Sequence, residues 1–261
     1  LSDAIKINKL NSKLFYIPKH EALGQFNAEF GDELYLFEEH PADGNLSLED
    51  ENFTGNIYST YDVFGKIHEN ENQVVDEKEY IRARLFDMLI GDWDRHQDQW
   101  RWLEFKENDK IIFKPLPRDR DQAFSVMSDG FILSAAVKLI PMAKLLRKYG
   151  DDLVDVKGFN IEPFPIDKAF IRHLNEEDWK EQVAFIQNNI TNEVIDEAFS
   201  NIPSELNDET IANIKSTLKQ RKNNLQEISK RYFNLVSKYS VVTGTNKKDY
   251  FTIFCLLLLQ L

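Results

Sequence analysis

Two dense clusters of acidic and basic side chains stand out in this sequence, with a short apolar run between them. The first cluster, residues 91–102, reads GDWDRHQDQWRW, and the second, residues 115–124, reads PLPRDRDQAF. The apolar run, residues 111–113, reads IIF. Each cluster borders a strand-like run, and no other part of the chain looks as suited to chemistry.

The residues between the clusters predict a β-hairpin. Residues 101–105 and 110–116 look like two strands, and residues 106–109, which read KEND, look like the turn between them. A hairpin returns the chain on itself, so we expect Asp119 to lie close to Asp94, although 25 positions separate them.

The residue types in the clusters suit a site for a metal and a phosphate. Mg²⁺ prefers carboxylate and amide oxygens, usually one or two carboxylates together with substrate phosphates. Phosphoryl transfer also needs a carboxylate near the acceptor hydroxyl. We therefore predict that Asp94 is that carboxylate and that Gln99 and Asp119 bind the metal. Arg95 and His96 would orient the loop or neutralise charge.

Several neighbouring residues have more than one interpretation. Asp121 is either a further metal ligand or a partner of Arg118 or Arg120. For His96, a hydrogen bond that holds the loop is favoured over a role as general base. Asp92 is expected to be solvated or to cap a helix.

The motifs in the two clusters resemble those of the atypical kinase superfamily. The shared pattern is Asp-Arg-His, an amide or acid three positions later, a strand pair, and an Asp shortly before a Phe. That superfamily includes HipA-like kinases, spore-coat CotH-type kinases, secretory-pathway casein kinases and phosphoinositide kinases. The second motif is most similar to the CotH pattern Trp-Asp-x-Asp-x-x-Phe, for which residues 118–124 read RDRDQAF.

The resemblance implies a reaction and its cofactors. It makes Asp94 the catalytic-loop aspartate, in the run Asp94, Arg95 and His96, and makes Asp119 the metal-binding aspartate. Gln99 takes the place of a metal-binding Asn, which departs from the pattern but keeps an amide oxygen. The implied activity transfers the γ-phosphate of ATP to an unidentified hydroxyl acceptor, with Mg²⁺ or Mn²⁺ as the second cofactor.

The same resemblance implies an α+β, kinase-like fold. It would consist mainly of the helical C-terminal lobe with a β-hairpin at the active site, and its small lobe would be incomplete. Residues 34–39 read as a buried strand that ends in acids. In a kinase this strand would lead into the hinge, so that Phe37, Glu38 and Glu39 meet the adenine. The alternative is a core strand with solvated acids at its end. No Gly-rich phosphate loop precedes residue 34.

Three domains follow from this interpretation: residues 1–39 as a small-lobe remnant with its hinge, 40–239 as the helical lobe, and 240–261 as the start of a β-rich domain. A helix is expected from an N-cap at Asp76 to Leu89, with Arg84 and Asp87 as solvated charges. Further helices are expected over 131–149, 176–189, 191–199 and 205–238, the last packed on the lobe in preference to a coiled coil. Residues 40–60 and 66–75 read as polar loops, and 241–254 as a hairpin.

Residues 82–102 also resemble a kinase-like segment of large cell-envelope proteins of Bacteroidetes. In those proteins the segment lies between a calcineurin-like phosphoesterase domain and a β-barrel. The resemblance implies a location in the cell envelope, with association through further domains.

Composition excludes some classes of function. The net charge of −12 argues against general binding to nucleic acid or to anionic membranes. No run of about 18 apolar residues occurs, so no membrane span is expected. The hydrophobic fraction of 42% supports a packed core. The single cysteine excludes an internal disulfide.

Two other functions stay open. The Gln at the Asn position, and the lack of a recognisable phosphate-binding Lys, favour an inactive pseudokinase that acts as a scaffold. Clustered Asp and His residues would also suit a metal-dependent phosphohydrolase. The few histidines, which lack metal-ligand spacing, make this second alternative weaker.

Overall fold

The computed structural model describes residues 1–44, 46, 48, 50–125, 149–200, 202–203, 207–239, 242, 244, 247–250 and 252. The expected helix over residues 131–149 lies outside these ranges, apart from its last residue, and so does half of the expected hairpin over 241–254. The proposed domain boundaries therefore stay predictions.

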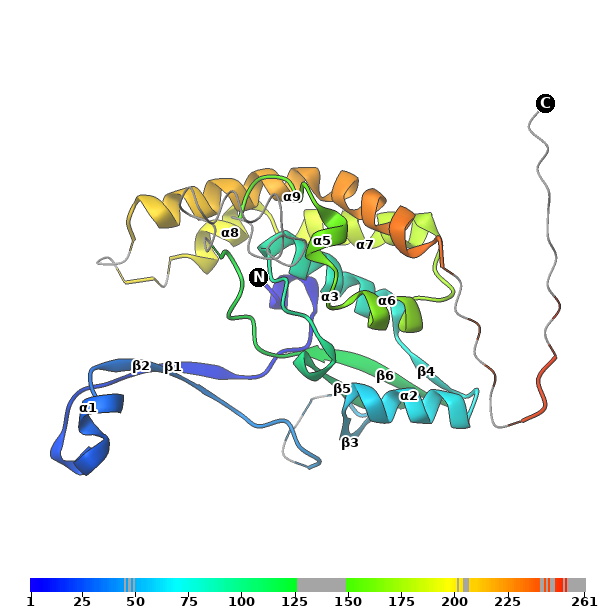
Figure 1. Ribbon diagram of the computed structural model, residues 1–261, viewed down its shortest axis with the longest axis horizontal. Helices are drawn as coiled ribbons and strands as arrows, with labels where there is room; N and C mark the ends of the chain where they lie inside the picture. The colour runs from blue at the N-terminus through cyan, green and yellow to red at the C-terminus, as the bar shows by residue number, and fades with distance from the viewer. Residues whose placement is uncertain are drawn as a thin grey trace.

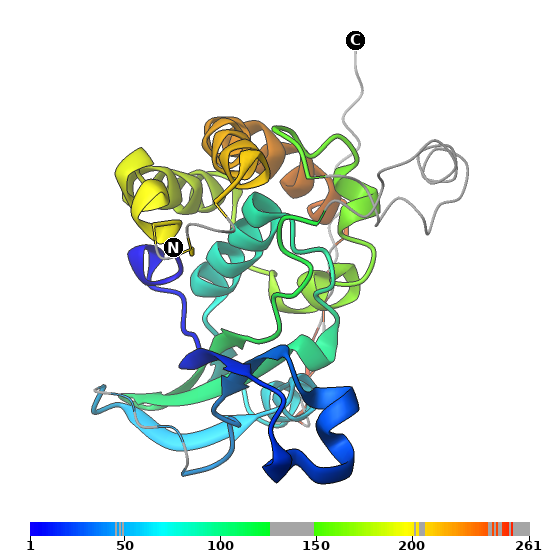
Figure 2. The same cartoon turned by 90° about the vertical axis from the view of Figure 1, so that its left-hand side faces the viewer.

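The described residues form an α+β fold in which a layer of helices lies over a four-stranded sheet (Figures 1 and 2), as the sequence predicted. The strands are β1 (Ser12–Ile17), β2 (Glu33–Glu38), β3 (Phe53–Tyr58), β4 (Gln73–Val75), β5 (Trp100–Glu107) and β6 (Lys110–Pro117). The helices are α1 (Asn27–Phe30), α2 (Thr60–Glu69), α3 (Glu77–Ile90), α5 (Val156–Phe159), α6 (Phe164–Phe170), α7 (Glu176–Asn189), α8 (Asn192–Ala198) and α9 (Glu209–Val236). Short 3₁₀ helices are η1 (Asp3–Ile5), η2 (Glu21–Phe26) and η3 (Gln97–Gln99).

The predicted hairpin is confirmed and forms the centre of the sheet, whose strand order is β3-β5-β6-β4. β5 and β6 pair antiparallel from Trp100 with Pro117 to Glu107 with Lys110. The outer strands were missed, because β3 and β4 lie in segments that read as polar loops. β3 pairs antiparallel with β5, and β4 pairs parallel with β6. Both outer strands are only partly buried, so they have no strong apolar pattern of their own. Their positions are set by pairing with β5 and β6.

Helix α3 is the central helix and ends where the first charged cluster begins. Asp76 caps it, as predicted, by accepting a hydrogen bond from the backbone N–H of Glu79 at 2.9 Å. The helix packs against α7, α9 and β6, and all of its residues from Tyr80 to Ile90 except Arg82 are buried. Gly91 follows with φ of 79°, the left-handed conformation that favours glycine at a helix end.

Helix α9 packs against α7 and α3, which confirms the expectation of a packed helix over a coiled coil. Arg221 interrupts the apolar pattern of α9, and its side chain is nevertheless buried. The guanidinium is satisfied by donating hydrogen bonds to three backbone carbonyls. These belong to Gly150, Met88 and Asp152. Within the described ranges, no helix has the length and apolar character needed to cross a membrane.

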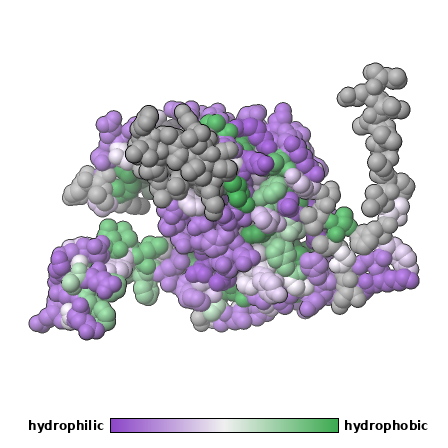
Figure 3. Space-filling model, in the orientation of Figure 1, coloured by the Kyte–Doolittle hydropathy of each residue, from purple (hydrophilic) through white to green (hydrophobic). Residues whose placement is uncertain are grey.

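Strands β1 and β2 form a separate two-stranded ribbon that extends away from the rest of the fold (Figure 1). The sequence predicted a strand over residues 34–39, which matches β2 to within one residue at each end, but its expected burial is wrong. Leu34, Leu36 and Phe37 are 57%, 64% and 69% exposed. In the part of the chain that the structure describes, β2 pairs only with β1, and most residues of both strands are exposed. Apolar residues are accordingly visible along it in Figure 3.

Candidate active site

The loop after α3 carries the first predicted group of site residues. His96 caps the start of η3, and its Nδ1 accepts a hydrogen bond from the backbone N–H of Asp98 at 3.2 Å. Its other ring nitrogen, Nε2, lies 3.9 Å from Asp94 Oδ1. The side chains of Asp94 and His96 are 29% and 39% exposed. His96 thus holds the loop by a hydrogen bond, while the Asp94 side chain stays partly exposed to solvent.

The second cluster begins where β6 ends and returns to the end of α3. The Arg118 N–H donates to the Gln99 carbonyl at 2.9 Å, and the Phe124 N–H donates to the Ile90 carbonyl at 2.9 Å. Asp119 has a φ of 47°, an uncommon value for a residue other than glycine. The two clusters are therefore joined along their backbones, as the predicted hairpin requires.

Gln99 and Asp119, the two predicted metal ligands, meet through their side chains. Gln99 Nε2 lies 3.4 Å from Asp119 Oδ2 and donates a hydrogen bond to it. A metal would need the amide oxygen of Gln99 instead, which a half-turn about the terminal torsion would present. Asp121, the third predicted ligand, is exposed in the turn over residues 121–124.

Arg95 is fully buried and joins the two clusters. Its guanidinium donates to the backbone carbonyls of Arg118, Asp119 and Gln99, at 3.0 Å for Asp119 and 3.1 Å for Gln99. It also stacks over the Trp100 ring at 4.7 Å. Of the two roles predicted for Arg95, these contacts fit the one that orients the loop.

A buried group of charges beneath the loops was missed by the sequence analysis. Arg84 and Asp87 were expected to be solvated, yet both side chains are completely buried and paired at 2.8 Å. Arg120 pairs with Asp87 at 2.7 Å, so it is not the partner of Asp121. The signal was present in α3, because most of the residues from 80 to 90 are apolar, so that part of the helix has no wide polar face for these two charges.

Asp92 also differs from its expected solvated position. Its side chain is fully buried 3.5 Å from Arg95 Nη1, and neither carboxylate oxygen accepts a hydrogen bond from the described residues. Burial, together with the nearby negative charge of Asp87, raises the pKa of Asp92 to about 7.

The available donors suit a metal that is bound together with phosphates. Across the described parts of the chain, no group of three or more His, Cys, Asp or Glu side chains is placed to hold a metal. One carboxylate and one amide, as at Asp119 and Gln99, are nevertheless a usual protein contribution to Mg²⁺ when a nucleotide supplies the remaining oxygens.

The predicted adenine residues lie on a different sheet from the two clusters. Phe37, Glu38 and Glu39 are at the end of β2, beside Asn11, Lys13 and His40, and with them line an open pocket of about 550 Å³. The structure thus brings together the residues of the two clusters, while these three belong to the β1–β2 ribbon.

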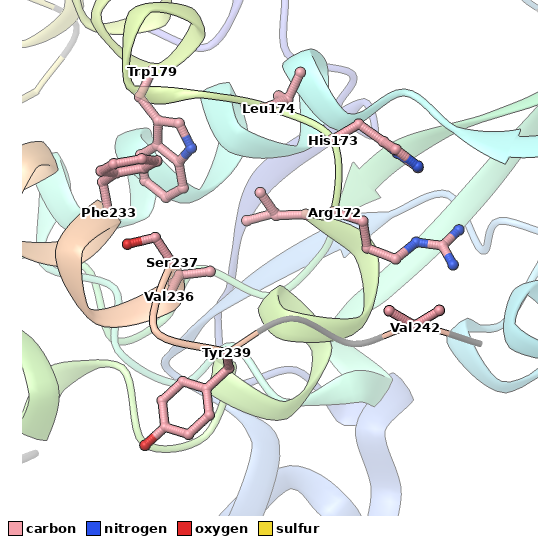
Figure 4. Close-up of a pocket in the computed structure, with 10 residues that line it drawn as sticks. Arg172, His173, Leu174, Trp179, Phe233, Val236, Ser237, Tyr239 and Val242 are labelled. Carbon is pink, nitrogen blue, oxygen red and sulfur yellow. The ribbon is translucent and has the colours of Figure 1, made fainter. Parts of the chain in front are cut away.

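A cavity of about 510 Å³ lies elsewhere, beside the end of α9 and the start of α7 (Figure 4). Trp179, Phe233 and Val236 are among the residues that line it, whereas the Arg172 and His173 side chains point away from Trp179. None of the predicted site residues lines this cavity.

Comparisons with known proteins give one likeness. No protein-family model matches the chain, and no curated protein matches it. Among solved structures, the chain is similar to the Helicobacter pylori proinflammatory kinase CtkA, with a TM-score of 0.44 and 12% identity, over 90% of this chain and 84% of that one.

Proposed function

We propose that this chain is a kinase-like domain that transfers the γ-phosphate of ATP to a hydroxyl group, with Mg²⁺ or Mn²⁺. The observation that carries the proposal is the contact between Gln99 and Asp119 across the two clusters. An amide and a carboxylate that meet, with a partly exposed second carboxylate, Asp94, in the loop that leads to Gln99, are groups of the kind that phosphoryl transfer uses.

Each residue has a distinct part in the proposed reaction. Asp94 accepts the proton of the attacking hydroxyl, because its partly exposed carboxylate is open to an acceptor. Asp119 and the turned amide of Gln99 hold the metal, which would neutralise charge on the phosphates. Arg95 acts on the loops and does not touch the substrate, because its side chain is fully buried. His96 fixes the loop through Asp98.

The nucleotide base is assigned to the ribbon. We propose that Phe37 provides an apolar contact for the adenine and that the backbone of Glu38 and Glu39 provides its hydrogen bonds. The open pocket at these residues supports this assignment. The cell-envelope location and the hydroxyl acceptor both stay predictions of the family resemblance.

Calorimetric titration of Mg-ATP and Mn-ATP tests the proposal. We expect metal-dependent binding that Asp119→Asn weakens at least about tenfold, because it removes the carboxylate from the metal. Asp98→Asn is the matched control. The Asp98 side chain lies in the same loop and is 79% exposed, and the substitution removes the same single negative charge. Binding that needs no metal, or an equal loss in both variants, would contradict the metal assignment.

A scaffold function is the second candidate, and the orientation of the Gln99 amide favours it. The amide nitrogen faces Asp119, so the carboxylate has a hydrogen-bond donor without a metal. If neither Mg-ATP nor Mn-ATP binds, this candidate replaces the first. The phosphohydrolase is weaker, because two metals would need more carboxylate or histidine ligands than this site provides.

A further inference from the structure

Both loops of the candidate active site are tied to one buried carboxylate, Asp87, in the last turns of α3. Its Oδ2 lies 2.8 Å from Arg84 Nη1 and 3.3 Å from Arg95 Nε. Its Oδ1 accepts a hydrogen bond from Arg120 Nη1 at 2.7 Å. Arg95 belongs to the loop after α3 and Arg120 to the segment after β6, so a single side chain on the central helix contacts both loops.

The charges around Asp87 make its carboxylate difficult to replace. Three guanidinium groups face it, and the other acids paired with them are Asp92, beside Arg95, and Asp167, beside Arg84. Removing one partner of a buried ion pair leaves the other charge uncompensated. Without the Asp87 carboxylate, Arg95 and Arg120 would each have to move toward another acceptor or toward water.

A movement of Arg95 would reach the predicted metal ligands directly. Its guanidinium holds the backbone carbonyls of Gln99 and Asp119, whose side chains meet. Arg120 follows Asp119 in sequence, so its tether to Asp87 fixes the same segment a second time. Groups that orient metal ligands from behind typically change metal affinity by about 10–100-fold when they are removed.

We propose that Asp87 is a positioning residue that sets the separation of the two loops and thereby the metal affinity of Gln99 and Asp119. The effect on metal affinity rests on the proposed function. The role of Asp87 in positioning the two loops does not. Asp167 provides a matched comparison, because it is an equally buried acid of the same network. Its partners, Arg84, Tyr80 and Tyr232, all lie on α3 and α9, away from the loops.

The test compares Asp87→Asn with Asp167→Asn in the full chain. We expect Asp87→Asn to weaken Mn-ATP binding at least about tenfold, and Asp167→Asn to leave it unchanged, although both lower the melting temperature. Hydrogen exchange gives a readout that needs no metal. Each variant is measured at the same number of degrees below its own melting temperature. The backbone amides of Arg118 and Phe124 donate to the carbonyls of Gln99 and Ile90. These two amides should exchange faster in Asp87→Asn and not in Asp167→Asn.

The outcomes separate the two proposals. If the wild type binds no Mn-ATP, the proposed function fails and hydrogen exchange alone decides the role of Asp87. Equal effects of the two substitutions, or wild-type protection in Asp87→Asn, would overturn the positioning role. If Asp87→Asn does not fold, Arg120→Gln is the second variant, because the Arg120 side chain is 22% exposed. It should release the Phe124 amide, and wild-type protection there would overturn the proposal.

Discussion

At the scale of single residues, the candidate site depends on which charges are buried. Asp94 and His96 are partly exposed, whereas Arg95 between them is fully buried. The sequence places these three residues side by side and cannot separate their roles, because the same residue types occur in substrate-binding and structural positions. The structure separates them through the carbonyl groups that Arg95 binds.

Arg95→Lys should destabilise the fold. The guanidinium presents several donors in a fixed plane, and a single ammonium cannot reach the three carbonyls and the two acids, Asp87 and Asp92, that face it. We expect urea titration to show a loss of about 2–4 kcal/mol in the free energy of unfolding. Arg101→Lys is the control, because Arg101 donates to carbonyls through one nitrogen only. An equal loss in both variants would mean that the fork geometry is unimportant.

At the scale of elements, the end of α3 fixes the start of the site. Gly91 has φ of 79°, and a Cβ there would lie 2.7 Å from Tyr149 Cδ2. Tyr149 in turn donates a hydrogen bond to the Leu89 carbonyl and packs against Phe124. The turn that leads to Asp94 is therefore held by both its backbone conformation and its neighbours.

Gly91→Ala should lower the free energy of unfolding by about 1–3 kcal/mol, because alanine is strained at positive φ and its Cβ would displace Tyr149. Gly65→Ala is the opposite control. Gly65 lies in α2 with nothing within 4 Å of an added Cβ, so alanine there should stabilise by about 0.5–1 kcal/mol. Thermal denaturation of the two variants distinguishes the effects by their sign.

Elements with a strong local signal could be predicted from the sequence, and the others could not. The β5–β6 hairpin and the helices α3, α7 and α8 were correct, because the turn residues and the apolar spacing that indicate them lie within each segment. β3 and β4 were missed because they gain their order from pairing with the hairpin. The exposure of β2 was missed because the burial of a strand depends on the elements that pack against it. The sequence of the strand alone does not show which elements those are.

At the scale of the whole molecule, one fully buried acid and one half-buried acid should make stability depend on pH. Burial is the main cause that raises the pKa of Asp92 to about 7, with a contribution from Asp87. Burial likewise raises the pKa of Glu79 to about 7, with a contribution from Asp76. The ordinary values for these groups are 3.8 and 4.5. Between the ordinary and the raised pKa values, these acids are therefore protonated in the folded chain and ionised in the unfolded chain.

The sign of the effect follows from this difference in proton binding. Stability is lost wherever the folded state holds more protons than the unfolded state, so it should fall as the pH rises from about 4 to about 7 and then level off. Because a tenfold change in proton affinity corresponds to about 1.4 kcal/mol, each acid can contribute about 1–4 kcal/mol.

Asp92→Asn should therefore reduce the fall in melting temperature between pH 5 and pH 8, since an amide does not ionise. Asp98→Asn, on a side chain 79% exposed, should leave that fall unchanged. A wild-type fall that Asp92→Asn leaves intact would show that Asp92 is ionised throughout and paired with Arg95.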